Sequence, residues 1–179
     1  MKKIAVYLSA VTENKHYVSI TQSLGELIVQ SGYGLVFGGS GVGLMKVLAD
    51  TVLDQGGYVS GVSVKVLQDS AMQNLSELTI AQDLHERKTL MREKADAYIA
   101  LPGGNGTLDE ITQVIEERKL GIHDKPVVVI NADGFYDGLH MQYKTMQSQG
   151  FLSGQVDDLV IFVTTPEQAI NIISKSLIE

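Results

Sequence analysis

At residues 97–110 the chain has the sequence AYIALPGGNGTLDE, and the order of its parts indicates the fold class. The first part, Ala97–Leu101, is a short apolar run of the kind that forms a buried strand. The second part, Pro102–Thr107, places three glycines in four positions around Asn105, directly before a segment that continues as a helix. A strand, a glycine-rich loop and a helix in this order are the repeating unit of parallel α/β sheets.

The same alternation extends outward along the chain. Apolar runs rich in β-branched residues recur between segments of helical spacing. This order predicts right-handed crossovers and a doubly wound parallel α/β sheet with helices on both faces, in one domain spanning residues 1–179. The polar segment Lys65–Gln82 is the least regular, and we expect a loop or flap beside the site there. The expected strands are Ile4–Leu8, Leu35–Phe37, Tyr58–Val64, Ala97–Leu101, Val127–Ile130 and Leu159–Val163.

Composition and charge exclude several classes of function. Hydrophobic residues make up 44% and charged residues 20%, which is ordinary for a globular protein. The net charge of −7 disfavours nucleic acid and anionic membranes as partners, so any phosphate must be held locally. With no cysteine and four scattered histidines, we expect neither a disulfide nor a metal site. The apolar start turns polar at Ser9, too early for a signal peptide, and no run approaches the ~20 residues of a membrane helix. We therefore expect a cytoplasmic protein.

A second glycine-rich loop, Gly38–Met45, also follows an expected strand and begins a helix. Backbone N–H groups and the helix dipole at such a junction hold anions, which predicts a phosphate-binding loop. The loop matches neither G-x-G-x-x-G nor a P-loop, because Leu44 and Met45 stand where Lys and Ser/Thr would be. The alternative is that its glycines only allow a tight turn and close packing. The residues expected to bind phosphate here are Gly39, Ser40, Gly41 and Gly43.

Arg87 lies in a helix expected at about residues 83–95. From Arg87 this helix continues for about 12 Å and the next strand returns about 13 Å, so Arg87 lies level with the loop at Pro102. A cation, a carboxylate and two anion-binding loops then converge at one sheet edge, which indicates an active site. The alternative is that Arg87 or Lys88 lays its stem along the core and places its charge in water. The apolar stripe of this helix consists of Leu84, Met91 and Ala95.

Glu110 has two interpretations. Thr107 and Glu110 fit the capping box T-x-x-E, in which each side chain binds a free backbone N–H at a helix start. Thr165–Gln168 fits the same pattern without a glycine loop before it, and it serves as a comparison. In the other interpretation, Glu110 is the carboxylate of the active site and lies beside Arg87.

Three motifs resemble those of the Lonely Guy phosphoribohydrolases, a family once labelled lysine decarboxylases. They are Glu86-Arg87-Lys88 with Met91, the run Pro-Gly-Gly-x-Gly-Thr-x-x-Glu at Pro102–Glu110, and Leu120–Pro126. Weaker likeness covers almost the whole chain, including Gly38–Met45 and Asn131–Tyr136. The resemblance implies a Rossmann-like fold, a homodimer or larger assembly, and neither metal nor cofactor. It also implies hydrolysis of a nucleoside 5′-monophosphate, AMP or the N6-modified AMP of a cytokinin ribotide, to free base and ribose 5-phosphate.

The resemblance assigns Arg87 and Glu110 as the catalytic residues. A carboxylate beside the anomeric carbon can stabilise an oxocarbenium-like state and orient the attacking water or a ribose hydroxyl. A guanidinium that stays charged at any relevant pH can support the leaving purine. The nucleotide-binding residues that the resemblance implies are Lys88, Met91, Gly103, Gly104, Asn105, Gly106, Thr107, Leu108 and Asp109.

The chain departs from the family pattern at Ser40, Lys46, Asn105 and residues 116–119, which have the sequence EERK. The charged residues 116–119 indicate either a solvated helix face or a pocket that does not accept a prenylated adenine. A rival function is that of the similar-looking molybdenum cofactor carriers, which hold a ligand without chemistry. Lysine decarboxylation is rejected because no lysine has a recognisable cofactor-linking context.

Overall fold

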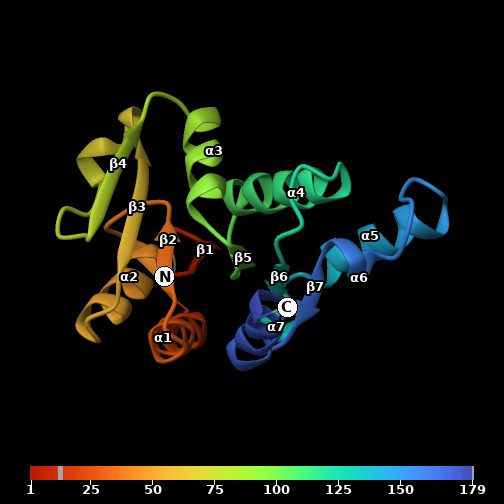
Figure 1. Ribbon diagram of the computed structural model, residues 1–179, viewed down its shortest axis with the longest axis horizontal. Coiled ribbons are helices and arrows are strands. Elements are labelled where there is room, and N and C mark those ends of the chain that lie inside the picture. Colours follow the sequence, from red (N-terminus) through yellow and green to blue (C-terminus); the bar gives the residue numbers. More distant parts are fainter. Residues whose placement is uncertain (12–13, 179) are drawn as a thin grey trace.

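A computed structural model describes residues 1–11 and 14–178 of the chain. The described residues form a seven-stranded sheet in the order β4-β3-β2-β1-β5-β6-β7, and all paired strands are parallel (Figure 1). The predicted fold class is confirmed. The strands are β1 (Lys3–Tyr7), β2 (Gly34–Phe37), β3 (Val59–Val64), β4 (Glu77–Ala81), β5 (Ala97–Ala100), β6 (Val127–Ile130) and β7 (Ile161–Val163).

Helices cover both faces of the sheet (Figure 1). One face packs against α1 (Lys15–Gln30), α2 (Gly43–Asp54) and α7 (Pro166–Ile178), and its core includes Leu24, Leu48 and Ile173. The other face packs against α3 (Leu84–Lys94), α4 (Asn105–Lys119), α5 (Asp137–Ser148) and α6 (Val156–Leu159). Central strands are buried on both faces, as β6 with its sequence VVVI illustrates, which is why these strands have continuous apolar runs. Among the described residues, no helix is long and apolar enough to cross a membrane.

Two expectations about the local structure of the outer parts of the sheet were wrong. The segment 65–82, expected to be a loop or flap, contains a 3₁₀ helix, η1 (Lys65–Ser70), and the edge strand β4. Because β4 pairs with β3 alone and is mostly half-buried, its sequence lacks the apolar run of a central strand. The strand expected from Leu159 begins only at Ile161, because residues 156–159 form α6.

Candidate active site

The candidate site lies where β1 and β5 are neighbours in the sheet. The chain leaves β1 for a helix on one face and leaves β5 for a helix on the other, and crevices for ligands open at such points. A cavity of about 400 Å³ lies here. Its walls come from residues 8–10 after β1, the loop between β2 and α2, η1, α3, and the start of α4.

Arg87 is held over this cavity by the start of α3. Asp83 caps the helix, because its side chain accepts the backbone N–H of Glu86 (2.8 Å), and Arg87 follows in the first turn. Its Nε donates to the carbonyl of Val62 (2.9 Å) and its Nη2 to the carbonyl of Gly38 (3.4 Å). A Cβ at position 38 would lie 2.1 Å from Nη2, so only glycine leaves room for the guanidinium. The alternative interpretation required the Arg87 side chain to place its charge in water, and it does not do so.

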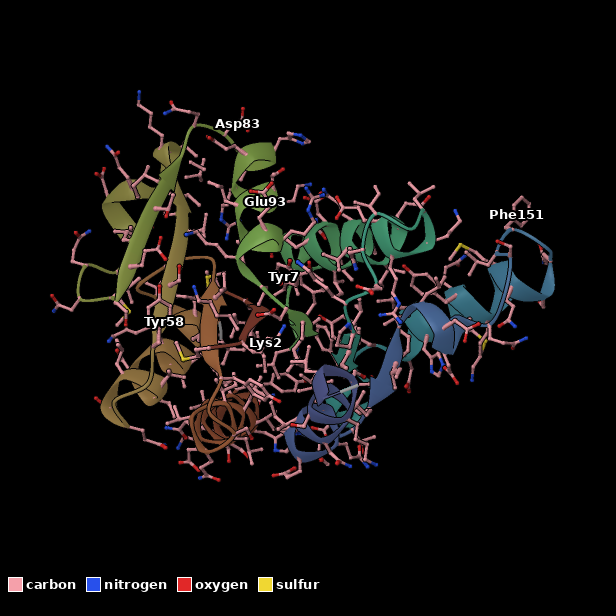
Figure 2. The ribbon with its side chains drawn as sticks, viewed as in Figure 1. Lys2, Tyr7, Tyr58, Asp83, Glu93 and Phe151 are labelled. Carbon is pink, nitrogen blue, oxygen red and sulfur yellow. The ribbon has the colours of Figure 1, made fainter. Side chains whose placement is uncertain are left out.

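Glu110 forms a buried ion pair with Arg87, as the active-site interpretation predicted. Arg87 Nη1 lies 2.8 Å from Glu110 Oε1, and the two side chains are 11% and 6% exposed. Burial raises the pKa of Glu110 above its ordinary value, and the Arg87 guanidinium opposes this effect. Tyr7, at the end of β1, lies between α3 and the sheet (Figure 2), and burial together with the Glu110 charge raises the pKa of its hydroxyl. The two charged side chains, those of Arg87 and Glu110, therefore line a poorly solvated part of the cavity.

The capping interpretation of Glu110 was wrong. Helix α4 begins at Asn105 with Gly104 as its cap, so Thr107 is already the third helical residue. The comparison segment at α7 does form the box: Gln168 Oε1 accepts the N–H of Thr165 (3.3 Å), and Thr165 Oγ1 accepts the N–H of Gln168 (3.4 Å). The carboxylate of Glu110 instead lies in the buried interface with α3.

The start of α4 presents backbone donors to the cavity. No described side chain accepts a hydrogen bond at the Gly104 cap, and Gly104, Gly106 and Thr107 line the cavity. A Cβ at Gly103 would lie 2.2 Å from Thr107 Oγ1, so the loop can pack this closely on the helix only with glycine there. Helix N-termini of this kind bind anions through their amides and their dipole. This end of the cavity is therefore suited to a phosphate.

The first glycine loop is tied to η1. Gly41 N–H donates to the carbonyl of Ser70 (2.8 Å), and the carbonyl of Gly39 accepts the N–H of Met72 (2.9 Å). A Cβ at Gly43 would lie 2.1 Å from the carbonyl oxygen of Ala10. Close packing and positive φ, the alternative considered for this loop, therefore account for Gly39 and Gly43, while the N–H of Gly41 is already used in the bond to Ser70. Of the four residues expected to bind phosphate here, all of which are described, Ser40 alone lines the cavity.

Comparison with known proteins identifies the family. A family model described as "Possible lysine decarboxylase" matches residues 45–173. A cytokinin riboside 5′-monophosphate phosphoribohydrolase of Rhodococcoides fascians is 37% identical over 173 residues, which cover 94% of this chain and 87% of that protein. The chain belongs to the Lonely Guy family. A rice protein (Oryza sativa subsp. japonica) named as a probable enzyme of the same kind is 42% identical over 147 residues, which cover 81% of this chain and 66% of that protein.

Solved structures share the fold at lower identity. A molybdenum cofactor binding protein from Rippkaea orientalis superposes with a TM-score of 0.74 at 22% identity, and the match covers 100% of this chain and 99% of that one. The molybdenum cofactor carrier protein of Chlamydomonas reinhardtii gives a TM-score of 0.72 at 19% identity, with all of both chains covered. At these identities the likeness concerns the fold alone.

Several residues that the Lonely Guy motifs implicate lie outside the cavity lining. Met91, expected to bind the nucleotide, is fully buried in the core under α3 and α4, and Leu108 packs against the same core. Lys88 pairs with Asp109 (2.9 Å) across the two helices, next to the Arg87–Glu110 pair. Asn105 is exposed at the first position of α4. Binding by Lys88, Asn105 and Asp109 stays a prediction, whereas the burial of Met91 assigns it to the core.

The cavity also has walls that the sequence did not indicate. Ser9 and Ala10 follow β1, and their place could have been inferred, because the carboxyl ends of parallel strands share one edge. Leu67 and Ser70 come from η1, in the segment 65–82 that was expected beside the site without any of its residues being singled out. Within residues 1–11 and 14–178, no group of three or more His, Asp or Glu side chains is placed to hold a metal ion.

Proposed function

We propose that this chain is a nucleoside 5′-monophosphate phosphoribohydrolase, which cleaves the N-glycosidic bond of AMP or of an N6-modified AMP. The observation that carries the proposal is the buried Arg87–Glu110 pair in a cavity bounded by the start of α4. The family membership and the relatives, which are named as cytokinin riboside 5′-monophosphate phosphoribohydrolases, support the same reaction. The products are the free base and ribose 5-phosphate.

Glu110 faces the charge that the reaction develops on the sugar. Breaking the bond leaves positive charge at the anomeric carbon, and a carboxylate in a poorly solvated cavity stabilises this charge more strongly than it would in water. The same carboxylate can orient the attacking water, as in glycosidases. Because burial raises the pKa of Glu110, the ionised form is lost at a higher pH than for an ordinary glutamate. Turnover should fall on the acid side as this carboxylate gains a proton.

Arg87 serves the opposite charge. The departing purine takes up the electron pair of the broken bond, and a permanently charged guanidinium stabilises that negative charge without itself giving up a proton. The guanidinium is fixed by carbonyl oxygens of Val62 and Gly38 in addition to Glu110. These contacts hold it in place before substrate arrives, so little reorganisation is needed during the reaction.

The decisive experiment is incubation with AMP and with N6-isopentenyl-AMP, followed by chromatography for the free base. Release of base together with an equal amount of ribose 5-phosphate supports the proposal. Glu110→Ala should lose turnover by about a thousandfold while still binding AMP, which is the scale expected for a lost electrostatic group. Binding of AMP by the wild type without release of base would favour a carrier protein instead.

Self-association is a second part of the proposal. The chain exposes the apolar side chains of Leu120 and Ile122 just after α4, at 64% and 59%, and a second copy would cover such a surface in a homodimer. Phe151, also exposed, lies beyond α5 at the far end of the molecule from α3 (Figure 2). Light scattering of the wild type and of Leu120→Asp tests this, since a wild type that is monomeric at micromolar concentration would contradict it.

A further inference from the structure

The segment 131–137 forms a tight turn at the carboxyl end of β6. Asn131 N–H donates to the carbonyl of Val163 at the end of β7 (2.7 Å), which fixes the start of the turn. The Asn131 side chain accepts the N–H of Tyr136 (2.6 Å) and donates to Asp137 (2.7 Å). Asp133 has a φ of +52°, an uncommon conformation that the surrounding hydrogen bonds hold in place. The turn therefore sets the position of Tyr136 through two separate contacts of one asparagine.

Tyr136 reaches from this turn to the loop of the candidate site. Its hydroxyl donates to the carbonyl of Leu101 (2.7 Å), and the backbone N–H of Gly103 lies close enough to oppose the rise of its pKa. One buried hydroxyl thus holds the start of the three-residue segment that leads from β5 to the cap of α4 and lies near its end. Tyr136 is 3% exposed, and burial raises the pKa of its hydroxyl, so it stays a donor over the whole working range of pH.

The loop that Tyr136 holds is the one that fixes the start of α4. Gly103 packs directly on Thr107, and Gly104 is the helix cap. We propose that Tyr136 is a positioning residue, whose hydroxyl sets the backbone donors at the start of α4 where they bind the 5′-phosphate of the nucleotide. This inference rests on the proposed function. It assigns to the 131–137 turn a task in phosphate affinity, not in the bond-breaking step.

The chain contains a matched control for this hydroxyl. Tyr98 is also buried, and its hydroxyl donates to a backbone carbonyl, that of Arg92 at 3.2 Å, away from the cavity lining. Tyr136→Phe and Tyr98→Phe therefore each remove one buried hydroxyl that donates to a carbonyl, without removing the ring. Only the first change touches the loop before α4.

The test compares ligands with and without a phosphate, by calorimetry on the full chain. For Tyr136→Phe, we expect the Kd of AMP and of ribose 5-phosphate to rise by roughly fivefold or more, as for one lost hydrogen bond, with the Kd of adenosine unchanged. In turnover, KM for AMP should rise by a similar factor and kcat should stay within about twofold. Tyr98→Phe should leave all of these values unchanged. Asn131→Ala, which loosens the turn and keeps the Tyr136 hydroxyl, should also raise the Kd of AMP, but by a smaller factor.

Equal weakening of AMP and adenosine by Tyr136→Phe would overturn the inference, as would an effect no larger than that of Tyr98→Phe. A wild type that binds ribose 5-phosphate but releases no base from AMP would refute the proposed function. In that case the ratio of the AMP and adenosine affinities still decides the role of Tyr136. A wild type that binds neither AMP nor ribose 5-phosphate would refute both the proposed function and the role of Tyr136.

Discussion

Removal of the Arg87 guanidinium should destabilise the protein by an amount that depends on pH. In Arg87→Met the carboxylate of Glu110 stays buried, at 6% exposure, and loses the cation that lies 2.8 Å away. A buried charge left without its partner costs about 3–5 kcal/mol of the free energy of unfolding. The carbonyl oxygens of Val62 and Gly38 lose their donors as well, which places the expected loss in the upper part of that range.

The sign of the pH dependence follows from the carboxyl group. Burial already raises the pKa of Glu110, and without the opposing guanidinium the pKa in the folded state rises further. A folded-state pKa above the unfolded value favours folding at low pH, and this contribution is lost as pH rises through the folded pKa. The difference between Arg87→Met and the wild type should therefore be smallest near pH 4.5, where only the pH-independent loss of the two carbonyl bonds remains, and largest above pH 7.

Urea unfolding at pH 4.5, 6 and 8 measures this difference. The double variant Arg87→Met with Glu110→Gln carries no buried charge at this site, so it should be more stable than Arg87→Met alone at pH 8 and nearly independent of pH relative to the wild type. Arg87→Met could lose the same free energy at all three pH values, or the separate effects of Arg87→Met and Glu110→Gln could simply add in the double variant. In either case the ion pair described here would not be the source of the effect.

Three further changes separate the roles of neighbouring residues. Gly103→Ala should raise KM for AMP by about tenfold or more, because the new Cβ would lie 2.2 Å from Thr107 Oγ1, whereas Gly138→Ala, which meets nothing within 4 Å, should leave KM unchanged. Met91→Ala should lower the free energy of unfolding by about 2–5 kcal/mol through a core cavity, with KM for AMP unaltered; a raised KM would restore Met91 to the binding site. The hydrogen bond from Lys94 lowers the pKa of Glu77 to about 2, so Glu77 adds stability above its unfolded pKa that is lost as pH falls toward 2. Because its side chain is 39% exposed, Glu77→Gln should cost less than about 1 kcal/mol at pH 7 in urea unfolding, and a loss of several kcal/mol would contradict this account of the β4 edge.

The sequence predicted the sheet and the meeting of Arg87 with the Pro102 loop because both depend on fixed dimensions of the backbone. The rise per residue of a helix and of a strand places Arg87 level with that loop whatever the side chains between them. The contribution of η1 could not be predicted in this way. Residues 65–70 are exposed, and their position depends on long-range hydrogen bonds such as that from Gly41 to Ser70. Such contacts leave no periodic pattern in the sequence.

Met91 illustrates the opposite difficulty. Its place in a family motif implied contact with the nucleotide, yet it is fully buried in the core. Leu84, expected on the same apolar stripe, is 56% exposed at the first position of α3. A motif and a stripe indicate which residues share a helix face, but the neighbouring helix determines which part of that face is covered. Here Arg87, in the first turn of α3, is buried against Glu110 of α4, whereas Leu84 in the same turn faces solvent.

The contrast between Thr107 and Thr165 explains how both halves of the site arise together. At α7 the fourth residue of the T-x-x-Q pattern returns to the helix start and binds its amide. At α4 the glycines start the helix earlier, and Glu110 is drawn away to Arg87, 23 residues before it in the chain. Among residues 1–11 and 14–178, no side chain then accepts a hydrogen bond at the cap of this helix, so its first amides can bind an anion from outside the chain. One departure from ordinary capping therefore places a carboxylate beside a guanidinium and, in the same helix, leaves the donors that a phosphate requires.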